Sequence, residues 1–464
     1  MSTPRQPAPA RAASARALAG DILRQSRLGK GFASELLDQA LRRHRLTEPD
    51  RRLLTELVYG VLRRRSALAA LVAPFLRRAP EAIDPRVWDA LHLGAYQLAF
   101  LGHVPAHAAV SESVELVKTF NPRAAGFVNS VLRRVSELLT RDETAAPAAN
   151  ALPLEQGRYR RLAKDVFPRP DEDPAGYLAS AFTLPDWLAR RWLVRFGFEE
   201  CVRLGFWFAA HPPLWLRCNK LRTTREELRD RLAAGGVRSE PGDHPQSLRL
   251  LDRRPVTALP GYAEGLFTVQ DQSAMAVADV LAPRPGWTVL DLCAAPGGKT
   301  THLAEHMDNR GKVIACDIDA DRLRTVASLC ERLGVTIVEP WFVRPDAESD
   351  LPAGPFDAIL VDAPCSNTGV LGRRPEVRHR LREEELAELA ALQARLLRRA
   401  ADRLKPGGVI VYSTCSIEPE ENQEVVRAVL EERPELEMEG EHESRPGLPA
   451  DGGYWARLRK VNRT

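Results

Sequence analysis

Apolar residues in the first third of the chain recur at intervals of three and four positions. The spacing is clear at Leu36, Leu37 and Leu41, and it gathers apolar side chains on one face of a helix. Prolines separate the helical stretches, and strand-like runs are missing. After a loose tail at 1–12, the pattern therefore predicts an all-helical domain over 13–140.

The pattern changes twice in the middle of the chain. Residues 141–178 are rich in alanine, proline and charge, which is typical of a linker with at most one short helix. Residues 179–268 mix helical and strand-like stretches, and this predicts a small α+β module. Its expected elements are a helix over 187–198, a strand over 214–219, a helix from Thr223 or Thr224 to Ala234, and strands over 248–251 and 265–269.

Strand-like and helical stretches alternate regularly over 269–464. The strand-like runs are continuous and β-branched, as in buried parallel strands, and the alternation predicts βαβ units in a doubly wound, Rossmann-like α/β sheet. The expected strands cover 287–293, 312–317, 335–339, 356–363 and 408–414, with a last edge strand over 454–460. The expected helices begin near 299 and cover 320–333, 382–404 and 419–431.

Composition narrows the class of protein. A chain of 464 residues exceeds what one core normally serves, so two or three domains are expected. No apolar run approaches the ~20 residues of a membrane span, and the basic N-terminus lacks the apolar stretch of a secretory signal. Seven cysteines without a CxxC pair favour reduced thiols over a disulfide framework or a zinc ribbon. We therefore expect a cytoplasmic protein.

Positive charge is concentrated in the N-terminal domain. Residues 1–140 contain 21 lysines and arginines and 12 aspartates and glutamates, a net charge of +9, while the whole chain carries +4. Arginine favours a phosphate-rich partner, because its guanidinium pairs bidentately with phosphate; solvated helix faces are an equal alternative. The arginines concerned are Arg42, Arg43, Arg45, Arg51, Arg52, Arg63, Arg64, Arg65, Arg77 and Arg78.

The segment DLCAAPGGKT (291–300) joins the first strand of the C-terminal domain to its helix. Its small residues allow a ligand close to the backbone, and the helix N-terminus offers free amides. The GxGxxG fingerprint is missing, and a P-loop would need glycine where Cys293 stands. The pattern favours an adenosine-containing cofactor bound without a pyrophosphate.

Two acidic residues are candidates for binding that cofactor. Asp317 follows Gly298 by 19 positions, near the spacing of an acid that binds ribose hydroxyls. Its alternative role is to cap the following helix. Asp346, after the third strand, is a candidate for the adenine edge.

His302, Glu305 and His306 match the HxxEH pattern of a zinc peptidase helix. This helix, however, begins at the cofactor turn and should flank the sheet, a context that does not suit a peptidase. We therefore predict no metal site.

Cys365 and Cys415 each follow a predicted buried strand. Ligands bind at the carboxyl ends of parallel strands, and the 50 residues between the cysteines accommodate one crossover. We expect neighbouring strands that place both thiols on one rim. The alternatives are a disulfide or a pair of buried core thiols.

Two thiols suit covalent chemistry on a cytosine ring. A thiolate that adds to C6 makes C5 nucleophilic enough to accept a methyl group, and a second group must then remove the C5 proton. Asp362 could bind the base at N3 and its exocyclic amine, or serve as a structural acid at the strand end. Arg373, Arg374, Arg378 and Arg380 form a basic stretch suited to an RNA backbone, or to solvent.

Three strings in order and spacing resemble the RNA cytosine-5 methyltransferases that use S-adenosylmethionine: DLCAAPGGKT (291–300), DAPCSNTGVLGRRPE (362–376) and STCSIEPEEN (413–422). The resemblance implies that Cys415 is the nucleophile and that Cys365 releases the product. It places the cofactor beside Cys293, Ala294, Ala295, Pro296, Gly297, Gly298, Lys299, Asp317 and Asp362. LRCNK (216–220) and VQDQSA (269–274) match the family's RNA-positioning module and the start of its catalytic fold.

The N-terminal domain resembles a NusB-type RNA-binding domain at RRLLTELVYGVLRRR (51–65), LGAYQLAFL (93–101), VPAHAAVSESVELVK (104–118) and AGFVNSVLRRV (125–135). This fusion is typical of bacterial enzymes that methylate a cytosine of 16S ribosomal RNA. It implies a monomer that acts on naked RNA or early in assembly, away from membranes. Transfer RNA as substrate and a non-catalytic RNA-binding factor are the alternatives.

The chain departs from the family pattern at three places. Asn367 stands where glycine or alanine is common, and His379 stands where tryptophan is frequent. The usual Gly-Asp before the fourth strand is absent, which affects the assignment of Asp346. None of these departures falls on the two thiols.

Overall fold

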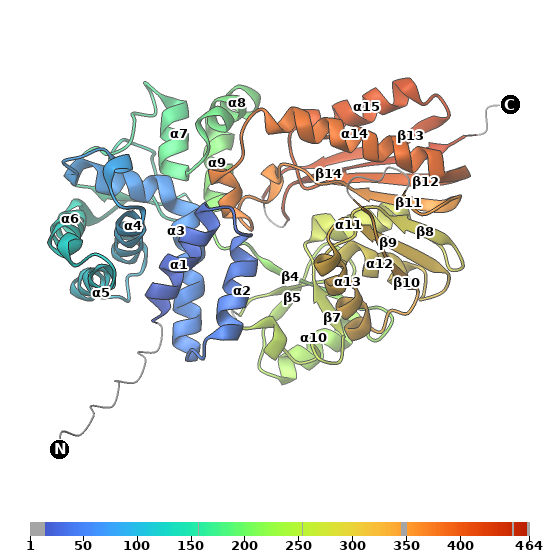
Figure 1. The fold of residues 1–464 in the computed structure, drawn as a ribbon, viewed down its shortest axis with the longest axis horizontal. Helices are drawn as coiled ribbons and strands as arrows, with labels where there is room; N and C mark the ends of the chain where they lie inside the picture. The colour runs from blue at the N-terminus through green and yellow to red at the C-terminus, as the bar shows by residue number, and fades with distance from the viewer. Residues whose placement is uncertain (1–13, 156, 253, 345–349, 448–449, 462–464) are drawn as a thin grey trace, which may run out of the picture. The chain divides into compact units, whose positions relative to one another are not determined.

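The computed structural model describes residues 14–155, 157–252, 254–344, 350–447 and 450–461. The chain packs into two compact units (Figure 1). Unit 1 comprises Met1–His211 and Leu371–Leu381, and unit 2 comprises Pro212–Val370 and Arg382–Thr464. These boundaries differ from those of the predicted domains, because segment 371–381, which was expected in the C-terminal domain, belongs to unit 1.

Unit 1 begins with the predicted helical bundle. Its helices are α1 (Ala15–Arg27), α2 (Ala33–Arg43), α3 (Glu48–Val72), α4 (Pro85–Phe100), α5 (Ala106–Lys118) and α6 (Ala125–Leu138). Ser14, Thr47 and Asp84 cap α1, α3 and α4 through their side chains, which satisfies amides that a helix leaves unpaired. Buried leucines and valines at helical spacing fill the core, among them Leu54, Leu57 and Val58 of α3.

The segment expected to be a linker has more structure than its composition indicated. It forms a three-stranded antiparallel sheet in the order β1-β3-β2, from β1 (Leu139–Thr144), β2 (Ala151–Pro153) and β3 (Tyr159–Leu162). Helices α7 (Pro174–Phe182), α8 (Asp186–Phe196) and α9 (Phe198–Ala209) complete the unit. The side chains of Leu152 and Tyr159 are buried, so tertiary packing overrides the weak local signal.

Segment 371–381 packs among these helices, and it corrects part of the charge interpretation. Arg378 is buried and donates to the carbonyl oxygens of Arg63 at 3.2 Å and Leu371 at 3.1 Å. Arg380 donates to the Gly31 carbonyl at 2.9 Å. Arg378 and Arg380 therefore bind protein carbonyls, and neither serves as an open basic surface.

Two arginines of α3 behave in the same way. The Arg63 side chain is buried and donates to the Gly372 carbonyl at 3.0 Å, and the buried Arg64 donates to the Pro153 carbonyl at 2.6 Å. Arg42, Arg43, Arg45, Arg52, Arg77 and Arg78 are exposed. Of the arginine-rich set, these exposed side chains are the ones that a phosphate-rich partner could reach.

Unit 2 contains a small four-stranded antiparallel sheet in the order β5-β6-β4-β7. Its strands are β4 (Leu214–Cys218), β5 (Ser239–Pro241), β6 (Ser247–Leu250) and β7 (Phe267–Val269), and α10 (Arg225–Ala234) packs beside them. Thr224 and Glu227 form a capping box at the start of α10, as the sequence suggested for this position.

A seven-stranded mixed sheet forms the rest of unit 2, in the order β10-β9-β8-β11-β12-β14-β13. The strands are β8 (Thr288–Asp291), β9 (Lys312–Asp317), β10 (Val338–Phe342), β11 (Phe356–Asp362), β12 (Leu404–Thr414), β13 (Leu436–Ser444) and β14 (Gly453–Lys460). The first five of the order are parallel, and β14 and β13 are antiparallel additions. The predicted edge strand at 454–460 is therefore interior, because β13 pairs with its outer side.

Helices cover both faces of this sheet (Figure 1). They are α11 (Gln272–Leu281), α12 (Gly298–His306), α13 (Ala320–Leu333), α14 (Glu385–Arg403) and α15 (Gln423–Glu432). Successive residues of β11 alternate between two apolar cores: Ile359 packs with α14 and α15, and Leu360 packs with α11 and α12. Two-sided burial explains the continuous apolar runs in the sequence.

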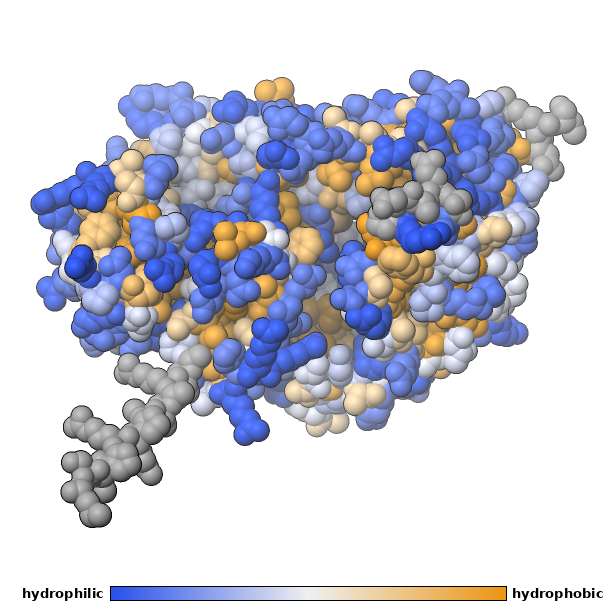
Figure 2. Space-filling view, viewed as in Figure 1, coloured by the Kyte–Doolittle hydropathy of each residue, from blue (hydrophilic) through white to orange (hydrophobic). Residues whose placement is uncertain are grey.

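Polar and charged side chains dominate the face shown in Figure 2, with apolar residues scattered among them. Among the described helices, none combines the length and the apolar character that a bilayer crossing requires.

Candidate active site

The candidate site lies at the carboxyl ends of the central strands of unit 2. From β8 the sheet extends to β9 and β10 on one side and to β11 and β12 on the other. The strand order therefore reverses direction between β8 and β11. In α/β sheets such a switch point leaves a crevice at the carboxyl ends of the strands, where ligands bind. Residues Cys293–Lys299 run from the end of β8 into the first turn of α12.

Close packing fixes the turn between β8 and α12. The Ala294 amide donates to the Cys316 carbonyl at 2.9 Å. Gly297 has φ of 100°, and a Cβ there would lie 3.2 Å from the backbone of Val326, so the position requires glycine. Burial raises the pKa of the Cys293 thiol well above its usual value, which keeps this cysteine protonated and unreactive.

Asp317, at the end of β9, lies against this turn. Its carboxylate accepts hydrogen bonds from the amides of Ala295 at 3.1 Å and Asp319 at 3.0 Å. The capping residue of α13 is Asp319, so the alternative role considered for Asp317 is filled by its neighbour. A carboxylate has further lone pairs for ribose hydroxyls. Asp346, the candidate for the adenine edge, lies outside the described residues.

The two thiols of the predicted pair lie side by side. Strands β11 and β12 pair in parallel, and Sγ of Cys365 is 3.3 Å from Sγ of Cys415. Both cysteines are half-buried. The hydrogen bond with Cys415, together with burial, raises the pKa of the Cys365 thiol well above its usual value. Cys365 therefore retains its proton while it contacts the neighbouring sulfur.

Asp362 connects the thiols with the cofactor turn. Its carboxylate accepts hydrogen bonds from Nζ of Lys299 at 2.8 Å and from the Ser413 hydroxyl at 2.8 Å. Burial alone would lower the pKa of Lys299, but the charge of Asp362, its hydrogen bond and the nearby Cys415 outweigh burial and raise that pKa. Lys299 is therefore held in its charged form, and its charge interacts with Cys415.

Glu421 was not identified from the sequence, although it organises the loops after both cysteines. Its buried carboxylate accepts hydrogen bonds from the Ser366 amide at 2.8 Å and from the Ser416 hydroxyl, and Gln393 donates to it at 3.0 Å. Ser366 and Ser416 directly follow Cys365 and Cys415 in the chain. Burial raises the pKa of Glu421. No local pattern shows that Glu418 and Glu421 of the string EPEEN are buried while Glu420 is not.

Asn367 was noted only as a departure from the family pattern, and the structure explains the residue. Its φ of 61° is left-handed, a conformation in which asparagine is the usual substitute for glycine. Its Nδ2 donates to the Cys365 carbonyl at 2.7 Å, and its Oδ1 accepts from the Cys415 thiol at 3.2 Å. The asparagine therefore touches both cysteines.

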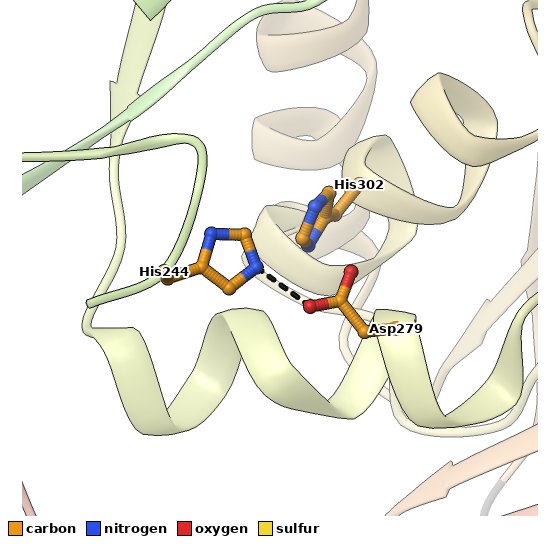
Figure 3. Close-up of side chains that lie close together, drawn as sticks. All are labelled: His244, Asp279 and His302. Atoms are coloured by element: carbon orange, nitrogen blue, oxygen red, sulfur yellow. Dashed lines mark hydrogen bonds and ion pairs between the residues drawn. The ribbon is translucent and has the colours of Figure 1, made fainter. Parts of the chain in front are cut away.

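The side chains of Glu305 and His302, from the HxxEH pattern, are hydrogen-bonded to other side chains of the protein. Glu305 forms a fully buried ion pair with Arg217 at 2.6 Å, so it is not available as a general base. His244, Asp279 and His302 place ligand atoms within 4.8 Å of one another (Figure 3). Nε2 of His244 is hydrogen-bonded to Asp279 at 2.7 Å and Nε2 of His302 to Gln246 at 2.9 Å, so these contacts form a hydrogen-bonded cluster.

Three family models match consecutive parts of the chain. The family described as NusB matches residues 13–137. A ferredoxin-like domain of the RsmF/B-like methyltransferases matches 184–257. The family described as 16S rRNA methyltransferase RsmB/F matches 278–448, which includes the cofactor turn and both cysteines of the pair.

Similar proteins span nearly the whole chain. The "Probable ribosomal RNA small subunit methyltransferase B" of Bacillus subtilis (strain 168) is 34% identical over 91% of this chain and 90% of its own length. The "Ribosomal RNA small subunit methyltransferase B" of Salmonella typhi is 35% identical over 90% and 92%, respectively. The crystal structure of PH0851 matches with a TM-score of 0.77 and 26% identity, over 98% of this chain and 100% of that chain. The chain therefore belongs to the 16S rRNA methyltransferase RsmB/F family and carries the family's methyltransferase fold behind a NusB-family helical domain.

Proposed function

We propose that this protein transfers a methyl group from S-adenosylmethionine to C5 of a cytosine in 16S ribosomal RNA. The observation that carries the proposal is the 3.3 Å contact between the sulfurs of Cys365 and Cys415. Near them in sequence, Asp362 accepts a hydrogen bond from Lys299 of the cofactor turn. Ribosomal RNA is favoured over transfer RNA by the names of the similar proteins, which refer to the small ribosomal subunit.

The residues of the crevice fit a nucleoside cofactor. The carboxylate of Asp317 suits ribose hydroxyls, and the glycine-only backbone at Gly297 allows a ligand close to the amides of α12. When bound, S-adenosylmethionine supplies an electrophilic methyl group on a sulfonium. The absence of a P-loop fits this cofactor, since it has no phosphate.

Cys415 acts as the nucleophile in the proposed reaction. Its thiolate adds to C6 of the cytosine, and the electron pair of the C5–C6 double bond becomes available at C5, which accepts the methyl group. The Asp362 carboxylate accepts a hydrogen bond from the exocyclic amine of the base, and it accepts a second one from N3 once N3 takes up a proton from solvent as the thiolate adds. Cys365, once it has released its own thiol proton to solvent, removes the C5 proton; the C6–S bond breaks, and the double bond re-forms as the Cys415 thiolate leaves.

Substitution of the two cysteines separates their roles. Cys415→Ser should abolish methyl transfer, because an alcohol is a far weaker nucleophile than a thiolate. Cys365→Ala should instead accumulate a covalent RNA–protein adduct, seen as a band of reduced mobility on a denaturing gel. Peptide mass spectrometry of that band should locate the RNA on Cys415. Methylation by the serine variant, or an adduct on another residue, would refute the assignment.

Bisulfite sequencing tests the substrate. Ribosomal RNA from cells that lack the gene should lose one protected cytosine in 16S RNA, and expression of the wild-type chain, but not of Cys415→Ser, should restore it. Loss of protection in transfer RNA alone would favour the alternative substrate.

A further inference from the structure

One fully buried side chain from the small sheet holds the glycine pair of the cofactor turn. Arg217 lies on β4, and its exposed fraction is 0%. Its Nη1 donates to the carbonyl oxygen of Gly298 at 2.6 Å. Its Nη2 donates to the hydroxyl of Thr301 at 3.0 Å, and that hydroxyl donates to the carbonyl oxygen of Gly297 at 2.9 Å. Arg217 thus fixes two successive carbonyl groups, one directly and one through Thr301.

The direction of these carbonyls decides the direction of the amides that follow them at the N-terminus of α12. In a trans peptide the C=O and the following N–H point in opposite directions. Holding the carbonyls of Gly297 and Gly298 therefore aims the N–H groups of Gly298 and Lys299. Glycine has the greatest backbone freedom of all residues, so these two amides need an external restraint more than ordinary helical ones do.

The charge of Arg217 is balanced inside the same network. Glu305, one turn further along α12 and also 0% exposed, pairs with it at 2.6 Å. The other carboxylate oxygen of Glu305 accepts from Gln246 at 3.0 Å, and Gln270 accepts a further hydrogen bond from Arg217. A buried ion pair of this kind adds little net stability compared with apolar residues, which favours a positioning role.

We propose that Arg217 is a positioning residue for cofactor binding, through which the small sheet sets the geometry of the glycine turn. The inference rests on the proposed function for the identity of the ligand, S-adenosylmethionine. Arg217 does not touch the reacting atoms; it acts through the peptide groups of Gly297 and Gly298.

A double substitution separates this role from simple stabilisation. Arg217→Met alone leaves Glu305 buried without its partner, so its melting temperature should fall. Arg217→Met/Glu305→Gln removes both charges and should recover most of that fall. The dissociation constant for S-adenosylmethionine is measured by titration calorimetry on the full chain. In the double variant it should remain raised about tenfold, because recovered stability does not restore the direction of the Gly298 and Lys299 amides.

Arg332 provides a matched control. This α13 arginine also donates to backbone carbonyls of the small module, those of Tyr262 at 3.1 Å and Phe267 at 2.9 Å, but it does not bond the cofactor turn. Arg332→Met should lower the melting temperature without a change in affinity for S-adenosylmethionine.

The outcomes distinguish the two proposals. Wild-type affinity in the double variant, or an equal loss in Arg332→Met, would overturn the role of Arg217. Failure of the wild-type chain to bind S-adenosylmethionine would instead overturn the proposed function. In steady-state kinetics the KM for S-adenosylmethionine should rise in the double variant more than kcat falls.

Discussion

At the scale of single residues, the cysteines of the chain differ in their burial and in their contacts. The chain contains seven cysteines, and burial contributes to the raised pKa values of six of them, Cys365 included. Cys365 and Cys415 differ from the other cysteines because their sulfurs touch each other, and the charge of Lys299 interacts with Cys415. Contact between the two sulfurs, more than burial, therefore distinguishes this pair from the other cysteines.

The pH dependence of stability reports on one buried acid of the site. Burial raises the pKa of Asp291 to about 7, from an ordinary value of 3.8. Between these values the unfolded chain releases the proton and the folded chain keeps it, so the free energy of unfolding falls as pH rises. Above about pH 7 this contribution is lost and the dependence levels off.

Asp291→Asn should remove this dependence. In urea unfolding between about pH 4 and about pH 7, the wild type should lose on the order of 1 kcal/mol per pH unit relative to the variant. The other titrating groups are shared by the two proteins, so their difference isolates Asp291. Identical pH profiles would mean that Asp291 is ionised in the folded protein.

At the scale of elements, the turn before α12 depends on backbone geometry that only one residue type allows. Gly297 combines a φ of 100° with a Cβ position 3.2 Å from the Val326 backbone. Asn367 meets a similar demand at the thiol loop with φ of 61°, where its side chain is also used as a hydrogen-bonding group. Local backbone conformation thus explains why one position tolerates asparagine and the other does not.

Gly297→Ala should disturb both stability and ligand binding. The left-handed backbone and the steric conflict with Val326 should together cost about 2 kcal/mol, and affinity for S-adenosylmethionine should fall about tenfold as the turn shifts. Gly286→Ala is the control, because Gly286 has φ of 89° but no atom within 4 Å of a Cβ. It should lose about 1 kcal/mol and bind the ligand normally; equal affinity losses in the two variants would contradict the steric explanation.

At the scale of the whole molecule, unit 1 is built from two separate parts of the sequence. Segment 371–381 follows Cys365 by only a few residues, yet its side chains bond unit 1. His379 bonds the Leu62 carbonyl at 2.9 Å, and burial lowers the pKa of this histidine to about 3. The core of the helical unit therefore includes a segment that lies only a few residues after Cys365 in the sequence.

Arg378→Ala tests the importance of that segment. The substitution leaves several buried carbonyls without a donor, among them those of Arg63 and Leu371, so it should destabilise unit 1 by about 3 kcal/mol in thermal or urea unfolding. Arg382→Ala is the control: its side chain is 70% exposed and pairs with Glu385 on the surface, so the change should stay within about 0.5 kcal/mol. Similar stability of the two variants would show that the segment is not needed.

The amino-acid sequence by itself determined the type of most elements, the doubly wound arrangement, the cofactor turn and the pair of cysteines. These features depend on periodicity, on glycine at special backbone positions and on residues that directly follow strands, all of which are local properties. Strand 312–317 and helix 320–333 were predicted with the bounds that the structure has.

Only the tertiary structure decided which polar side chains form hydrogen bonds inside the protein. Arg217 reaches Gly298 across 81 positions, Glu421 reaches Ser366 across 55, and Arg378 reaches Arg63 across 315. Nothing in the local sequence distinguishes these side chains from solvated ones, because the buried carbonyls and amides that fix them come together only when distant segments pack. For the same reason the weakly patterned segment 141–178 was taken for a linker, and β13, the partner of β14, was missed.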